Sequence, residues 1–265
     1  MKKTSIIVGA ILASLTITPA QAADVKPLVI IDSYFDSRVA SSNVSCIVVQ
    51  TESPCSDVVT AIPSLLSDEI NHGDAMVEVA KKQNPNVKII ALRSGIPSAK
   101  SVSGVNPATF ILALRWVEKN SNKIGAVSFS RYFNHASKPC MPIASSPYTP
   151  ESADVEIKRL VSSLKSKGVP VFSATGNTVG KPVDYPACIL DTNSVGVGSL
   201  NKLGVLVPGG SSDINTDFFA PLGANLVYSS PVLGKIANTT SSATVAIAVQ
   251  WLYNNAGQKF VNVLQ

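Results

Sequence analysis

Short apolar, β-branched runs alternate along the chain with longer segments that have helical spacing. The runs predicted to be strands are 28–31, 46–49, 87–92, 124–129, 169–173 and 194–198. Nearly continuous apolar strands of this kind are typical of a parallel sheet covered on both faces. The pattern therefore predicts an α/β fold, a three-layer sandwich in which a mostly parallel central sheet lies between helices.

Four longer segments have apolar residues at helical spacing. They contain Ala75, Met76, Val79 and Ala80; Phe110, Leu114 and Val117; Val155, Leu160, Val161 and Leu164; and the apolar stretch 245–252. Pro150 and Ser152 mark the start of the third helix, and the Ser- and Pro-rich segment 137–150 predicts a long surface loop. Because no repeat or interdomain linker interrupts this pattern, it predicts a single domain over residues 23–265.

The first 22 residues have the three parts of a secretory signal peptide. Lys2 and Lys3 give a positive start, a mostly apolar segment runs to Thr16, and Ala20 and Ala22 form an A-x-A cleavage site. The apolar segment is too short to span a bilayer, and no later segment has about 18 uninterrupted apolar residues. We expect cleavage after Ala22 and a monomeric protein, secreted or periplasmic, without a membrane anchor.

Charge and motifs argue against two classes of partner. The formal charge of +5 includes Lys2 and Lys3, and no basic run follows them, so a nucleic-acid partner is not expected. No G-x-G-x-x-G or G-x-x-x-x-G-K-[ST] motif follows the first predicted strand, so nucleotide binding is disfavoured.

Export makes the four cysteines candidates for disulfide bonds. Cys46 and Cys55 are close enough in sequence to close a short loop, which leaves Cys140 to pair with Cys188, although four cysteines allow three connectivities. Metal binding is the weaker interpretation, because the chain has no C-x-x-C pair and His135, near Cys140, has no second ligand close by.

Three polar segments supply an acid, a base and a nucleophile. Asp32 follows the first predicted strand, His72 directly precedes a helical pattern, and Ser241 opens the last helix. Taken singly, each has a simpler structural interpretation, as a turn former, an exposed histidine or a helix N-cap. Taken together, they match what a serine nucleophile needs, and their order along the chain, Asp, His, Ser, is the order in subtilisin.

The chain resembles the subtilisin-like serine proteases over nearly all of residues 23–265. Asp32 matches the aspartate of the family's V-I-D-[ST]-G-x-D motif, His72 the first histidine of H-G-T-H-V, and Ser241 the serine of the T-S-x-A core. Asn177 matches the oxyanion-hole asparagine and follows Gly176, while Ser130 matches the serine of the substrate-binding strand N-x-S-x-G. The resemblance also extends to Asp36, to Tyr-Pro-Ala at 185–187 and to Ala-Pro at 220–221.

The resemblance implies a secreted serine endopeptidase that acts on polypeptides. Asp32, His72 and Ser241 would be its triad, Asn177 would serve its oxyanion hole, and Ser130 and Gly176 would bind substrate. No cofactor is implied. Calcium sites are common in the family, but no carboxylate cluster of the sequence matches one, so calcium stays unassigned.

Several positions depart from the family pattern. Tyr34 replaces a glycine and is expected to crowd the substrate cleft or alter the turn, and Thr239 replaces a glycine and is expected to shift Ser241. Arg131 and Tyr132 stand where the family has a small step, so they are expected to fill part of the specificity pocket.

Asp74 replaces the threonine of H-G-T-H, and its carboxylate would either raise the basicity of His72 or compete for it. Few residues separate Ala22 from the first strand, which leaves no room for the propeptide usual in the family. Together with Tyr34, Thr239 and Arg131, the missing propeptide supports an alternative: a catalytically impaired protein of the same fold that binds peptides or a partner.

Overall fold

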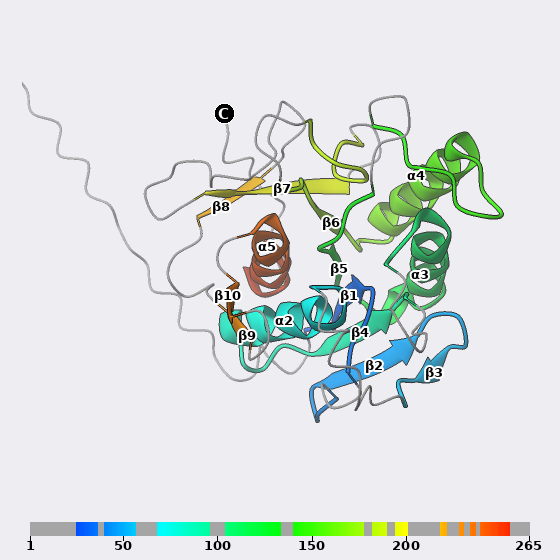
Figure 1. Cartoon of the computed structure of the whole chain (residues 1–265). Helices are drawn as coiled ribbons and strands as arrows, with labels where there is room; N and C mark the ends of the chain where they lie inside the picture. Colours follow the sequence, from blue (N-terminus) through cyan, green and yellow to red (C-terminus); the bar gives the residue numbers. More distant parts are fainter. Residues whose placement is uncertain are drawn as a thin grey trace, which may run out of the picture.

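Eight strands form one sheet through the molecule, in the order β3-β2-β4-β1-β5-β6-β7-β8 (Figure 1). In chain order they are β1 (Leu28–Asp32), β2 (Val44–Val48), β3 (Ser53–Pro54), β4 (Ile89–Arg93), β5 (Ala126–Phe129), β6 (Val171–Ala174), β7 (Ser194–Leu200) and β8 (Phe218–Pro221). All neighbours are parallel except β2 and β3. A separate antiparallel pair consists of β9 (Tyr228–Ser230) and β10 (Gly234–Ile236). The prediction of a mostly parallel central sheet is confirmed.

The structure is a computed structural model, and it describes residues 25–36, 40–56, 68–95, 104–133, 140–177, 182–189, 194–200, 218–221, 228–230, 234–236 and 239–254. The predicted signal peptide, residues 1–22, lies outside these ranges, and so do residues 137–139 of the predicted surface loop. The described part of that loop, up to Thr149, contains no helix and no strand beyond isolated bridges. None of the described helices is long and apolar enough to cross a membrane.

Two pairs of helices cover the two faces of the sheet (Figure 1). On one side lie α2 (Asp68–Gln83) and α5 (Thr240–Asn254), and on the other lie α3 (Pro107–Lys119) and α4 (Pro150–Ser166). Successive strand residues point to opposite faces, so Leu28 and Ile30 of β1 join the core under α2 and α5, whereas Val29 and Ile31 join the core under α3 and α4. Both faces are buried, which is why β1 is apolar at every one of these positions.

The helices agree with their predicted positions, with two corrections. The helix α2 begins at Asp68, so His72 lies inside this helix and not directly before it. Val155 has helical spacing in the sequence, but its side chain is 68% exposed. It lies two residues from both Ala153 and Ile157, which are buried, and a step of two residues on a helix leads to the opposite side.

Local capping explains where α3 and α4 begin. Each helix starts with a proline, and each has a capping box, formed by Asn106 with Thr109 and by Thr149 with Ser152. The proline lacks only an N–H that would have no partner in the first helical turn, and the caps satisfy other N–H groups there. The predicted helix start at Pro150 is confirmed.

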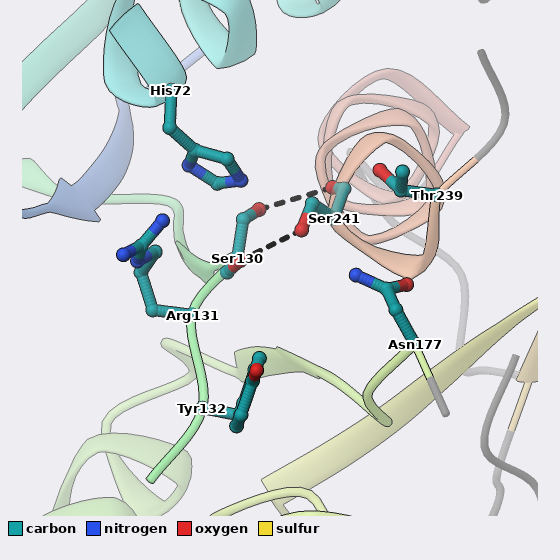
Figure 2. A pocket seen from close by; sticks show the side chains of 7 residues that line it. All are labelled: His72, Ser130, Arg131, Tyr132, Asn177, Thr239 and Ser241. Carbon is teal, nitrogen blue, oxygen red and sulfur yellow. Dashed lines mark hydrogen bonds between the residues drawn. The ribbon is translucent and has the colours of Figure 1, made fainter. Parts of the chain in front are cut away.

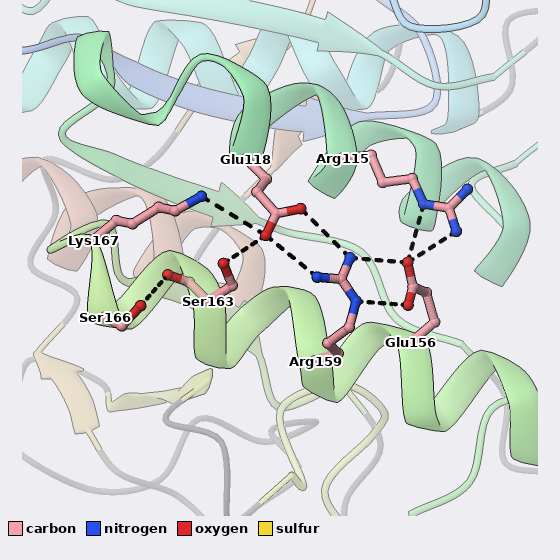
Figure 3. Close-up of polar contacts among 7 residues, drawn as sticks. All are labelled: Arg115, Glu118, Glu156, Arg159, Ser163, Ser166 and Lys167. Atoms are coloured by element: carbon pink, nitrogen blue, oxygen red, sulfur yellow. Dashed lines mark hydrogen bonds and ion pairs between the residues drawn. The ribbon is translucent and has the colours of Figure 1, made fainter.

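A network of charged side chains joins the outer surfaces of α3 and α4 (Figure 3). Arg159 bonds to Glu156 on its own helix and to Glu118 on α3, and Arg115 of α3 bonds to Glu156. Hydrogen bonds from Arg159 and, to a smaller extent, from Arg115 lower the pKa of Glu156 to about 2, although burial acts in the opposite direction. The network therefore keeps its carboxylates ionised and holds the two helices side by side.

The structure pairs Cys46 with Cys55 and Cys140 with Cys188. This is the expected connectivity. The first bridge links β2 to the residue that follows β3, at one edge of the sheet, and the second links the loop before α4 to the segment 182–189.

Candidate active site

The carboxyl ends of three neighbouring strands carry polar residues. Asp32 ends β1, Ser130 follows β5, and Asn177 lies shortly after β6. From β1 the chain builds β2 and β4 on one side and then crosses to β5 on the other, and open α/β sheets form their ligand crevices at such a switch of direction. His72 from α2 and Ser241 from α5 reach the same place (Figure 2).

A short hydrogen bond connects the predicted acid to the predicted base. His72 Nδ1 lies 2.6 Å from Asp32 Oδ2, and Asp32 is fully buried. An ionised carboxylate only accepts hydrogen bonds, so Nδ1 carries the proton and Nε2 of the neutral ring is left as an acceptor. This tautomer is the one that a general base requires.

The carboxylate of Asp32 is stabilised in its ionised form. Burial alone would raise its pKa, but the charge and hydrogen bond of His72, followed by the charge of Arg131 and the N–H of Ser33, together lower it below the ordinary value. Ser33 N donates to Asp32 Oδ1 over 2.8 Å, so both oxygens of the carboxylate are engaged. Asp32 is therefore an anion at neutral pH.

Gly73 explains how His72 comes so close to β1. A β-carbon at this position would lie 2.3 Å from the carbonyl oxygen of Tyr34 and 2.8 Å from Cε1 of Phe35. Distances this short are not tolerated, so only glycine lets α2 pack this closely against the segment after β1. The glycine after the histidine thus has a steric role.

Ser241 is bonded to the chain that follows β5. Its Oγ donates to the carbonyl oxygen of Ser130 over 2.8 Å, and Ser130 Oγ donates to the carbonyl oxygen of Ser241 over 3.0 Å (Figure 2). The hydroxyl of Ser241 is therefore directed to Ser130 and not to His72. All three side chains line one pocket of about 150 Å³, and rotation about one torsion is enough to redirect a serine hydroxyl.

Asn177 lines the same pocket, and its amide has a defined orientation. Its Oδ1 accepts hydrogen bonds from the backbone N–H of Thr240 over 3.1 Å and from Thr240 Oγ1 over 2.9 Å. Since the oxygen is held on the helix side, the NH₂ group faces the pocket (Figure 2). Gly176 just before it has a φ of 103°, which glycine adopts without strain. No sequence pattern indicates this role of Thr240, because the contact joins residues 63 positions apart.

The remaining wall of the pocket consists of Arg131, Tyr132 and Thr239 (Figure 2). Arg131 and Tyr132 thus lie in the pocket, as expected. Thr239 has a further role, because its Oγ1 accepts the N–H of Ser242 over 3.4 Å and so caps the start of α5.

At Tyr34 and at Asp74 the structure excludes one of the two expected effects: crowding of the cleft by Tyr34, and competition of Asp74 for His72. Tyr34 does not line the pocket: it is fully buried, and the Arg93 guanidinium lies 5.2 Å from its ring centroid. Asp74 does not take the proton of His72, since its Oδ1 accepts the N–H of Asp36 over 3.2 Å and Asp32 holds the ring. Both side chains help to shape the segment after β1. Among the described residues, no group of three His, Cys, Asp or Glu side chains is arranged to hold a metal ion.

No model of a known protein family matches the sequence, and no curated protein matches it. Solved structures do match. A lanthipeptide protease is 16% identical with a TM-score of 0.62, covering 86% of this chain and 73% of its own. The nisin leader peptidase NisP from Lactococcus lactis is 13% identical with a TM-score of 0.58, and the match covers 89% of this chain and 80% of the peptidase chain. A cold-adapted subtilisin-like serine proteinase is 17% identical with a TM-score of 0.53, covering 87% and 76%.

Identities this low bear on the fold alone. These three structures superpose on most of this chain, each with a TM-score above 0.5. The chain therefore has the fold of the subtilisin-like serine proteases.

Proposed function

We propose that the protein is a serine endopeptidase that hydrolyses polypeptides through Asp32, His72 and Ser241. The observation that carries the proposal is the buried 2.6 Å hydrogen bond between His72 and Asp32, beside a pocket that Ser241 and Asn177 also line. An imidazole oriented by a buried carboxylate next to a serine at a helix start is the arrangement that activates a serine nucleophile.

In the proposed acylation step, Ser241 Oγ attacks the substrate carbonyl carbon while its proton passes to His72 Nε2. Asp32 stabilises the imidazolium that forms. The oxyanion accepts hydrogen bonds from the NH₂ group of Asn177 and from the backbone N–H of Ser241, at the positive end of α5. His72 then gives its proton to the leaving amine, and water, activated by the same imidazole, releases the acyl group.

The proposal requires one local change. The hydroxyl of Ser241 must leave the carbonyl oxygen of Ser130 and turn toward His72. Ser130, which lines the pocket, and Gly176, which precedes Asn177, would then present backbone groups to an extended substrate. The protein would act outside the cytoplasm as a monomer after removal of residues 1–22, a location in which its two disulfide bonds are stable.

The test is labelling of the protein by a fluorophosphonate probe. We expect the native protein to be labelled, and both a heat-denatured sample and Ser241→Ala to remain unlabelled. Labelling of folded Ser241→Ala to the native extent would show that another residue is the nucleophile.

One observation favours the second candidate function, a binding module without catalysis. Ser241 Oγ donates to Ser130 and not to His72. If folded native protein is not labelled but binds unstructured polypeptides, the binding module is the better description.

A further inference from the structure

Arg131 lies beside the carboxylate that orients the candidate base. It follows Ser130 at the end of β5, lines the pocket, and its side chain is only 15% exposed. Its Nε lies 4.0 Å from Asp32 Oδ1. This is the carboxylate oxygen that His72 does not contact, because His72 bonds to Oδ2. The carboxylate therefore lies between an imidazole on one side and a guanidinium on the other.

Three other charged residues lie on the elements next to Asp32 and Arg131. Asp36 lies in the segment after β1, and Asp74 lies on α2, where its Oδ1 accepts the N–H of Asp36. Arg93 ends β4, is the register partner of Asp32, and lies over the ring of Tyr34. Of all these charged residues, Arg131 included, only Arg131 joins His72 in lowering the pKa of Asp32.

We propose that Arg131 is a positioning residue of the triad. Its guanidinium attracts Asp32 Oδ1, the carboxylate oxygen that does not contact His72, and it limits the basicity that this carboxylate confers on the imidazole. The role in catalysis rests on the proposed function, whereas the effect on His72 does not.

The physical reason is the balance of charges around the ring. A buried carboxylate at hydrogen-bond distance stabilises the imidazolium and so increases the affinity of the ring for its proton. A general base works best when this affinity is close to the working pH, because an imidazole that stays protonated accepts no proton from the nucleophile. A guanidinium is always charged, so at this position it offsets part of the effect of Asp32. Because it lies near Oδ1, it leaves the hydrogen bond between His72 Nδ1 and Asp32 Oδ2 intact.

The direct test is an NMR titration of the His72 ring. The chain has two histidines, so His135→Gln gives a parent protein in which His72 is the sole imidazole. In this parent, Arg131→Met removes the charge but keeps an unbranched apolar stem, and Arg131→Lys keeps the charge. Lys165→Met, at an exposed position in the last turn of α4, is the matched control for the loss of one positive charge from the whole molecule.

We expect the titration midpoint of His72 to rise in Arg131→Met, because the imidazolium loses a nearby like charge. It should stay at the parent value in Arg131→Lys and in Lys165→Met. An unchanged midpoint in Arg131→Met, or an equal rise in Lys165→Met, would overturn the proposal. If Arg131→Met does not fold, Arg131→Gln takes its place in the same comparison.

This readout needs no turnover, so it separates the two proposals. Absence of fluorophosphonate labelling would contradict the endopeptidase and leave the titration to decide on Arg131. In an active enzyme, Arg131→Met should also move the acid limb of kcat/KM to higher pH. A residue that only supports the structure would instead lower kcat/KM at every pH and leave the limb in place.

Discussion

A β-carbon on Gly73 would come within 2.3 Å of the carbonyl oxygen of Tyr34. The backbone of α2 is thus in direct contact with the segment that follows β1. His72, the preceding residue of α2, reaches Asp32 at the end of β1 because of this contact. A larger residue at position 73 would push α2, and His72 with it, away from β1.

Replacing Gly73 by alanine should therefore separate the acid from the base. We expect Gly73→Ala to destabilise the protein by about 1–3 kcal/mol, as overpacking does. We expect fluorophosphonate labelling to slow by roughly 10²-fold, since misplacement by about 1 Å has effects of this size. Urea unfolding and labelling rates measure the two effects. Glu78→Ala, on the same helix, is the control and should change stability by less than about 0.5 kcal/mol.

The amide of Asn177 faces the pocket, where the proposed oxyanion would form. We expect Asn177→Ala to lower kcat by about 10²–10³-fold with little change in KM, because the lost hydrogen bond is made chiefly in the transition state. This magnitude is the one known for the corresponding asparagine of subtilisin. Steady-state hydrolysis of a peptide substrate checks it. An equal loss through KM alone would show that Asn177 binds the ground state.

Thr240 holds the oxygen of that amide with its hydroxyl and its backbone N–H. Thr240→Val keeps the shape of the side chain but removes the hydroxyl, so we expect kcat to fall by roughly five- to tenfold, as for one hydrogen bond. Thr244→Val is the matched control. Its hydroxyl donates to the carbonyl oxygen of Thr240 within the same buried helix and does not reach the pocket, so its kcat should be unchanged.

The lowered pKa of Asp32 predicts a specific dependence of stability on pH. A carboxyl group whose pKa is lower in the folded protein adds stability above its unfolded pKa of about 4, and this contribution is lost as the pH falls through the folded value. The free energy of unfolding of the native protein should therefore exceed that of Asp32→Asn at neutral pH. The difference should shrink below about pH 4. A difference that is constant from pH 7 to pH 3 would contradict the charge of Asp32 as its cause.

The charge network between α3 and α4 should contribute modestly to stability and be sensitive to salt (Figure 3). Arg159 is half exposed and pairs with Glu156 and Glu118. We expect Arg159→Ala to lower the free energy of unfolding by about 0.5–1 kcal/mol, and by less in about 1 M NaCl, because salt screens exposed charges. Lys165→Ala removes an exposed cation of the same helix that takes no part in these ion pairs, and it should show a smaller change at both salt concentrations.

Local patterns in the sequence were sufficient for the fold class and the main elements. Strands such as β1 and helices such as α4 have a periodicity that depends only on nearby residues, and Pro150 marks a helix start through its own covalent geometry. Of the strands that were not predicted, β3, β9 and β10 have two or three residues each, too few for a period to appear. The fourth, β8, ends in a proline, a residue that is depleted in strands.

Short motifs identify the candidate site residues, since the order of amino acids shows which residue types stand at strand ends and helix starts. Which of these residues touch depends on the packing of whole elements against one another. Three features depend on contacts between elements far apart in sequence. Tyr34 turns inward, Ser241 bonds to Ser130, and Arg131 lies beside Asp32. Such contacts depend on how closely whole helices and strands pack, which local propensity does not encode.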